Sequence, residues 1–157
     1  IPALALALAL PASALAAGEG APAIQLMAGV FNVGKSPTQG EVGVELRRPL
    51  RWWGLDVAGG VAASEEESIW AHLGVRRDFE AGPRFVIAPG FAFAYYEQGD
   101  GKDLGGEIQF RSSIDLGFRL THGTRLGLTF YHLSNAGLED VNPGSNSAVL
   151  SYSLVLD

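Results

Sequence analysis

The chain carries a histidine and a serine two positions apart, His132 and Ser134, at the end of an apolar stretch. In a β-strand, residues i and i+2 point to the same face, so we expect the two side chains side by side. A neutral imidazole beside a hydroxyl can take its proton while the hydroxyl oxygen attacks an acyl carbonyl. Phe130, Leu128 and Leu126 share the parity of the pair. The spacing therefore predicts a hydrolytic pair on an apolar face, with a substrate that arrives from the apolar side.

By itself, a His-x-Ser pattern has a simpler interpretation, which is a polar pair at the interfacial end of a strand. Catalysis needs two further features: a group that holds the imidazole, and hydrogen-bond donors that face the developing oxyanion. The residues that could supply them follow the pair along the chain, in the stretch 135–146. Which interpretation holds depends on the elements that position this stretch.

Period-two alternation dominates the chain after residue 23. It predicts eight strands, at about 24–33, 40–50, 54–63, 67–78, 84–96, 105–120, 124–134 and 147–157. In most of them one face is apolar and the other small or polar, which is typical of a small transmembrane β-barrel. Most segments reach the ~9–11 residues needed to cross a bilayer at a tilt. An even number suits closure, which satisfies every backbone group in lipid. The predicted fold class is all-β, an eight-stranded antiparallel transmembrane β-barrel.

Eight strands leave a lumen that side chains fill, so the barrel is not expected to be a pore. Several charged residues have inward parity and should pair inside: Glu45, Asp56, Arg76, Glu107, Arg111 and Asp115. Short connections at 51–53, 80–83 and 121–123 alternate with longer or more polar ones at 35–39, 64–66, 97–103 and 135–146. Short periplasmic turns and long external loops alternate in this way. With a periplasmic N-terminus, the strand that ends at Ser134 runs outward.

Composition narrows the function further. The chain has 157 residues, enough for one domain, and a formal net charge of −6 with no basic stripe, which argues against nucleic-acid binding. It has no cysteine, which excludes disulfides and cysteine-ligated metals.

Residues 1–10 are apolar, and small residues at Ala14 and Ala16 follow. We expect residues 1–17 to be a signal peptide truncated at its start, and residues 18–157 to be the barrel domain.

The run His132-Leu133-Ser134-Asn135-Ala136-Gly137-Leu138, followed by Asn142-Pro143-Gly144 and a closing strand at 151–153, resembles the PagL-type lipid A 3-O-deacylases. The resemblance is close over about 25 C-terminal residues. Over the remainder of the chain it concerns the architecture only. It implies a barrel of the Gram-negative bacterial outer membrane whose active site faces the lipid. Its substrate would be lipid A, from which it removes the ester-linked 3-hydroxyacyl chain at position 3. No metal or organic cofactor is implied.

By the same resemblance, Ser134 is the nucleophile and His132 the base, and the Asn135 side chain and the Gly137 N–H form the oxyanion hole. One position departs from the family's pattern, in which a glutamate fourteen residues after the histidine orients it. Asn146 stands there in this chain. Its amide oxygen can still accept an imidazole N–H, but it carries no charge. Asn146 is thus the expected third member, with Glu139, Asp140 or no third member as alternatives.

Two other functions remain open at this point. A non-catalytic outer-membrane barrel, structural or lipid-binding, would follow if Asn146 does not replace the glutamate. A soluble barrel that binds a small apolar ligand would place residues such as Phe91, Phe93 and Ile114 inside, and charged residues outside. The membrane barrel and the soluble barrel differ in which face is apolar. Fractionation separates them, because recovery as a soluble periplasmic protein would rule out the membrane barrel.

Overall fold

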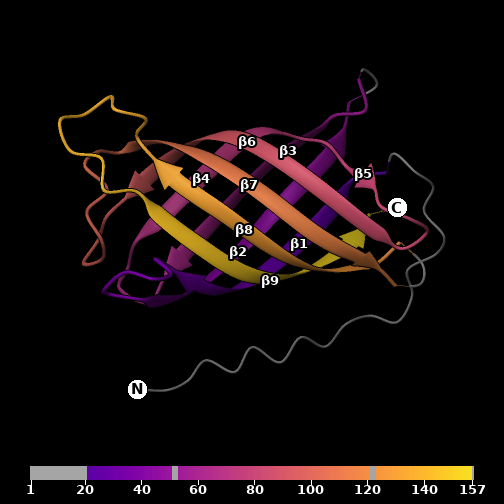
Figure 1. Ribbon diagram of the computed structural model, residues 1–157, viewed down its shortest axis with the longest axis horizontal. Helices are drawn as coiled ribbons and strands as arrows, with labels where there is room; N and C mark the ends of the chain where they lie inside the picture. Colours follow the sequence, from indigo (N-terminus) through magenta and orange to yellow (C-terminus); the bar gives the residue numbers. More distant parts are fainter. Residues whose placement is uncertain (1–20, 51–52, 121–122, 157) are drawn as a thin grey trace.

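The alternating segments form strands whose side chains point in turn to the outside and to the lumen. The computed structural model describes residues 21–50, 53–120 and 123–156 (Figure 1). Their strands are β1 (Ala23–Phe31), β2 (Gln39–Pro49), β3 (Asp56–Ser64), β4 (Ile69–Arg76), β5 (Phe79–Glu80), β6 (Phe85–Glu97), β7 (Ile108–Arg119), β8 (Arg125–Ser134) and β9 (Ser145–Val155).

Every strand pairing in the described residues is antiparallel, in the order β4-β3-β2-β1-β9-β8-β7-β6-β5. An additional pairing of β4 with β6 closes the sheet. β5 has only two residues and extends the turn before β6, so eight strands make the wall. The predicted eight-stranded barrel is therefore confirmed. The expected signal peptide, residues 1–17, lies outside the described residues.

Strand bounds differ from the prediction by a few residues at most, and one shift has a clear local cause. The predicted segment 105–120 begins instead at Ile108. Gly105 has φ of 83°, and its N–H donates to Asp103 Oδ1 at 2.7 Å. A positive φ turns the chain away from the extended conformation. Strand pairing therefore starts after this turn, and the exposed side chain of Glu107 lies at the barrel end instead of in the lumen.

The outer surface of the wall is apolar. Phe93 and Leu150 are each 64% exposed, and Leu73 is 63% exposed. The phenylalanines that a soluble ligand-binding barrel would bury, Phe91 and Phe93 among them, lie outside. The soluble-barrel alternative is therefore wrong. No helix in the described part of the chain is long and apolar enough to cross a membrane.

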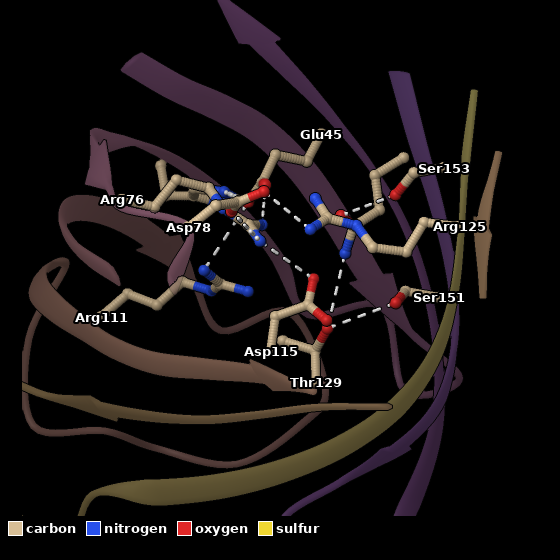
Figure 2. A network of polar contacts seen from close by, with 11 residues as sticks. Glu45, Arg76, Asp78, Arg111, Asp115, Arg125, Thr129, Ser151 and Ser153 are labelled. Carbon is tan, nitrogen blue, oxygen red and sulfur yellow. Dashed lines mark hydrogen bonds and ion pairs between the residues drawn. The ribbon is translucent and has the colours of Figure 1, made fainter. Parts of the chain in front are cut away.

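Charged side chains pair in the lumen instead (Figure 2). Arg76 lies between two carboxylates, with Nη1 3.3 Å from Glu45 Oε1 and Nη2 3.2 Å from Asp115 Oδ2. His72 Nε2 is 3.0 Å from Glu45 Oε2, and Arg111 Nη1 is 3.7 Å from the same oxygen. These four predicted inward charges, Glu45, Arg76, Arg111 and Asp115, are buried, whereas Asp56 is only half-buried. The network fills the barrel's middle, as expected for eight strands.

The long loops gather at one end of the barrel, and β5 lies at the other (Figure 1). Beneath the loops, the rings of Phe31 and Trp70 stack at 5.0 Å and that of Tyr96 lies 6.1 Å from Trp70. Leu133 and Leu104 are buried in the same cluster. The packed interior of this loop-bearing end supports the end of β8 from the lumen side. This is the part of the strand that carries His132 and Ser134.

Candidate active site

β8 directs His132 and Ser134 to the outer surface. Tyr131 and Leu133 alternate with them and are buried, at 5% and 0% exposed, whereas His132 is exposed and Ser134 half-buried. Phe130, on the same face, is 41% exposed. The structure thus places the predicted pair on the apolar face. In the described part of the chain, Ser134 Oγ has no hydrogen-bond partner, and catalytic hydrogen bonds often tighten only around a substrate.

Asn146 lies directly opposite His132. The two residues are register partners across β8 and β9, and His132 Nδ1 is 2.8 Å from Asn146 Oδ1. An amide oxygen only accepts hydrogen bonds, so this contact assigns the proton to Nδ1. Nε2 of the neutral ring then keeps its lone pair and can accept a proton. Glu139 and Asp140, the alternative third members, are exposed in the β8–β9 loop without a bond to His132 among the described contacts.

Gly144 makes room for the imidazole. Its φ is 57°, a conformation that side chains disfavour. A Cβ built on Gly144 would lie 2.8 Å from His132 Cε1 and 3.1 Å from Nε2. The Asn142-Pro143-Gly144 segment therefore passes against the ring, and only glycine leaves its edge free.

Two lysines from other loops hold this segment. Lys102 Nζ donates to the Gly144 carbonyl at 2.6 Å and to Asn32 Oδ1 at 2.6 Å, and Lys35 Nζ donates to the Pro143 carbonyl at 2.9 Å. Partial burial and the nearby Lys35 ammonium lower the pKa of Lys102. Neither lysine is evident from the sequence, because both approach the segment from loops far away along the chain.

The residues expected to form the oxyanion hole bond to each other. The Gly137 N–H donates to Asn135 Oδ1 at 2.9 Å. Asn135 Nδ2 donates to the carbonyls of Val141 at 2.8 Å and Leu104 at 3.3 Å. Asn135 is 0% exposed, and a buried amide must be satisfied by neighbours. The structure therefore holds the Asn135 side chain inside the loop, directed away from the outer face where Ser134 lies. The signal was available in the sequence, because Asn135 continues the inward parity of Leu133.

Asn142 braces the same loop. Its Oδ1 accepts the Asn135 N–H at 3.1 Å, and the Leu138 N–H donates to the Asn135 carbonyl at 3.0 Å. Ala136 has φ of 54° and Gly137 φ of 81°. These two successive left-handed residues close a tight turn that begins two positions after Ser134.

Aromatic rings line the outer face beside Ser134. Phe110 on β7 is its register partner. The Phe110 ring lies 5.3 Å from that of Phe93 and 5.9 Å from that of Phe91. These three rings cover the wall next to the hydroxyl with apolar surface, which suits an acyl chain. Among the described residues, no group of three His, Cys, Asp or Glu side chains could hold a metal ion.

Known proteins are similar to this chain in sequence. The family described as lipid A 3-O-deacylase (PagL) matches residues 38–155. A lipid A deacylase PagL of Bordetella bronchiseptica is 38% identical over 73 residues, which are 45% of this chain and 41% of that protein. The chain thus aligns with less than half of this relative's length.

Solved structures share the fold. The crystal structure of the outer membrane enzyme PagL has a TM-score of 0.64 at 22% identity, covering 85% of this chain and 99% of that one. Neisserial surface protein A has a TM-score of 0.61 at 12% identity, covering 86% and 97%. A designed transmembrane β-barrel has a TM-score of 0.63 at 10% identity, covering 90% and 100%. At these identities the likeness concerns the fold alone.

Proposed function

Because the chain belongs to the lipid A 3-O-deacylase (PagL) family, we propose that it hydrolyses the ester of the 3-hydroxyacyl chain at position 3 of lipid A. Its apolar outer face and its family make it an outer-membrane β-barrel protein. The observation that carries the proposal is the outward-facing pair His132 and Ser134, with Asn146 Oδ1 2.8 Å from His132 Nδ1. A lipid substrate reaches this pair laterally from the membrane.

In the proposed reaction, Ser134 Oγ attacks the acyl carbonyl and His132 Nε2 takes the hydroxyl proton. The C=O electrons move to the carbonyl oxygen and return as the bond to the sugar oxygen breaks. His132 gives its proton to that leaving oxygen, which leaves an acyl-Ser134 ester. Water then attacks this ester, with its proton passing to His132, and the collapse frees the fatty acid and returns the proton to Ser134. Each proton that His132 takes is returned, so no cofactor enters the balance.

Asn146 is proposed to orient the imidazole. Its contact leaves Nε2 as the acceptor, and the ring is confined between Asn146 and Gly144. A neutral amide stabilises the imidazolium less than a carboxylate would. We therefore expect this chain to hydrolyse its ester more slowly than a serine–histidine hydrolase whose third member is a carboxylate. The register pairing of β8 and β9 sets this contact, which supports Asn146 over Glu139 or Asp140.

The turn after Ser134 is proposed to stabilise the oxyanion. Gly137 N–H can exchange Asn135 Oδ1 for a charged oxygen, which is the stronger acceptor. The Asn135 amide would have to leave both Val141 and Leu104 to donate in the same way. We therefore assign Gly137 as the direct donor, and Asn135 as the residue that shapes the turn.

The deciding experiment compares lipid A from cells that express the wild-type chain or Ser134→Ala, using mass spectrometry. The expected result is loss of one 3-hydroxyacyl chain with wild type only. Heat-modifiable migration in electrophoresis checks that both proteins form folded barrels. Unchanged lipid A with a folded wild-type barrel would contradict the proposal, and would favour the non-catalytic barrel.

A further inference from the structure

A fourth polar side chain, Ser112, interrupts the apolar outer face beside His132, Ser134 and Asn146. Ser112 on β7 is the register partner of His132 on β8, and His132 is the register partner of Asn146 on β9. In an antiparallel sheet such partners point to the same face. Ser112, His132 and Asn146 therefore form a polar row across three neighbouring strands, all exposed on the outside.

The surroundings of Ser112 are otherwise large and apolar. Phe91 is its partner on β6, and Phe110 and Ile114 flank it on the same face of β7. The rings of Phe91 and Phe110 stack at 5.9 Å. Outward positions of β7 from Ile108 to Phe118 are apolar apart from Ser112. The serine is thus a single polar interruption of this strand's membrane-facing surface.

The Ser112 hydroxyl has no hydrogen-bond partner among the described residues. On a face that meets lipid, a hydroxyl without a partner is unfavourable, because hydrocarbon offers neither donor nor acceptor. Such positions in membrane proteins usually carry a function. Its register partner His132 has Nδ1 bonded to Asn146 and Nε2 assigned to Ser134, so the polar partner left to this hydroxyl is the substrate bound at Ser134.

We propose that Ser112 is a specificity-determining residue, which hydrogen-bonds the 3-hydroxyl of the acyl chain under hydrolysis. This inference rests on the proposed deacylase function. The reacting carbonyl carbon must lie at Ser134 Oγ, and Ser112 stands diagonally from Ser134 across the β7–β8 pair. Diagonal partners are about 7–8 Å apart, so a substituent close to the carbonyl lies between them. A serine hydroxyl can both donate to and accept from another hydroxyl.

The two ends of the acyl chain are then recognised differently. Ser112 contacts the hydroxyl near the carbonyl, and the rings of Phe91 and Phe110 contact the hydrocarbon beyond it. Ser112 has no part in proton transfer, because Asn146 already occupies His132 Nδ1 and Nε2 serves Ser134. Removing the hydroxyl should therefore change which ester is preferred, and leave hydrolysis of a plain acyl ester unchanged.

The test uses the full chain in detergent micelles with two synthetic lipid A esters. They differ only in the presence of the 3-hydroxyl on the acyl chain at position 3. The variants are Ser112→Ala, Ser112→Val and Ser112→Thr, and kcat/KM is measured for each ester. Threonine keeps the hydroxyl and valine has the same shape without it, so this pair separates hydrogen bonding from size. Heat-modifiable migration confirms that each barrel is folded.

Wild type and Ser112→Thr should prefer the hydroxylated ester. Ser112→Ala and Ser112→Val should lose about two- to tenfold of that preference, the range expected for one neutral hydrogen bond. An unchanged preference in both would overturn the role of Ser112 while the deacylase function stands. An equal loss on both esters would also overturn it, since Ser112 would then act on the reaction itself. If wild type cleaves neither ester, the proposed function fails and this inference fails with it.

Discussion

Oδ1 of Asn146 lies 2.8 Å from Nδ1 of His132, across a β8–β9 register pair on the outer surface of the barrel. The contact connects a neutral amide to the imidazole where the family pattern has a glutamate. Two neighbouring backbones fix the spacing, so a side chain of the same shape should keep it. The consequence is that the charge of the third group can be changed while its position is kept.

Asn146→Asp is therefore expected to raise the rate of ester hydrolysis. The aspartate has the shape of asparagine and adds a charge that stabilises the imidazolium formed during proton transfer. We expect kcat to rise by about tenfold or more, since the reverse change in serine proteases costs far more. Asn146→Leu should lower kcat, because nothing then holds the ring. Equal rates for wild type and Asn146→Leu in a micellar ester assay would refute an orienting role.

Gly144→Ala should displace the imidazole. The added Cβ would lie 2.8 Å from His132 Cε1, on a residue with φ of 57°. A displacement of about 1 Å can cost about a hundredfold in rate, which is the loss of kcat expected here. Gly34→Ala is the matched control, because Gly34 has φ of 77° but nothing within 4 Å of its Cβ position. If both variants lose activity equally, backbone strain and not the clash is responsible.

Arg76→Met should destabilise the barrel without touching the active site. Arg76 is 6% exposed and pairs with Glu45 and Asp115, so its removal leaves buried carboxylates without their common cation. Breaking a buried charge network in this way costs about 3–5 kcal/mol. Equilibrium unfolding in urea, in lipid vesicles, measures the change. Arg48→Met, at an exposed position on β2, should leave the free energy of unfolding nearly unchanged. A similar small effect at Arg76 would mean that the network contributes little.

Leu150→Arg tests which surface meets the lipid. Leu150 is 64% exposed near the middle of β9, so the arginine would face hydrocarbon. A charge at the bilayer midplane costs about 2–4 kcal/mol in barrels of this class, and much less near an interface. Leu156→Arg, just beyond the end of β9, is the matched interfacial substitution and should cost under about 1 kcal/mol. Equal costs at the two positions in vesicle unfolding experiments would contradict the predicted membrane placement.

Much of this architecture follows from local regularities. A period of two assigns faces residue by residue, so the alternation of β7 and β8 was enough to predict that Phe110 and His132 point outward and Arg111 and Leu133 inward. The same rule failed at Glu107, where the turn at Gly105 places the residue before β7 begins. The resemblance implied that the Asn135 side chain faces the oxyanion, whereas the structure buries this side chain, in line with the inward parity of Leu133.

The sequence by itself determined the number of strands, the apolar outer face and the outward pair His132 and Ser134, because these depend on side-chain order along one strand. Only the tertiary structure decided what surrounds the pair. The contact of Asn146 with His132 depends on the register of β9 against β8, and the neighbouring Ser112 on that of β7. The hydrogen bond from Lys102 to the Gly144 carbonyl depends on the meeting of the β6–β7 loop with the β8–β9 loop. Hydrogen bonds between strands and loops set these relations, and no periodicity within one segment encodes them.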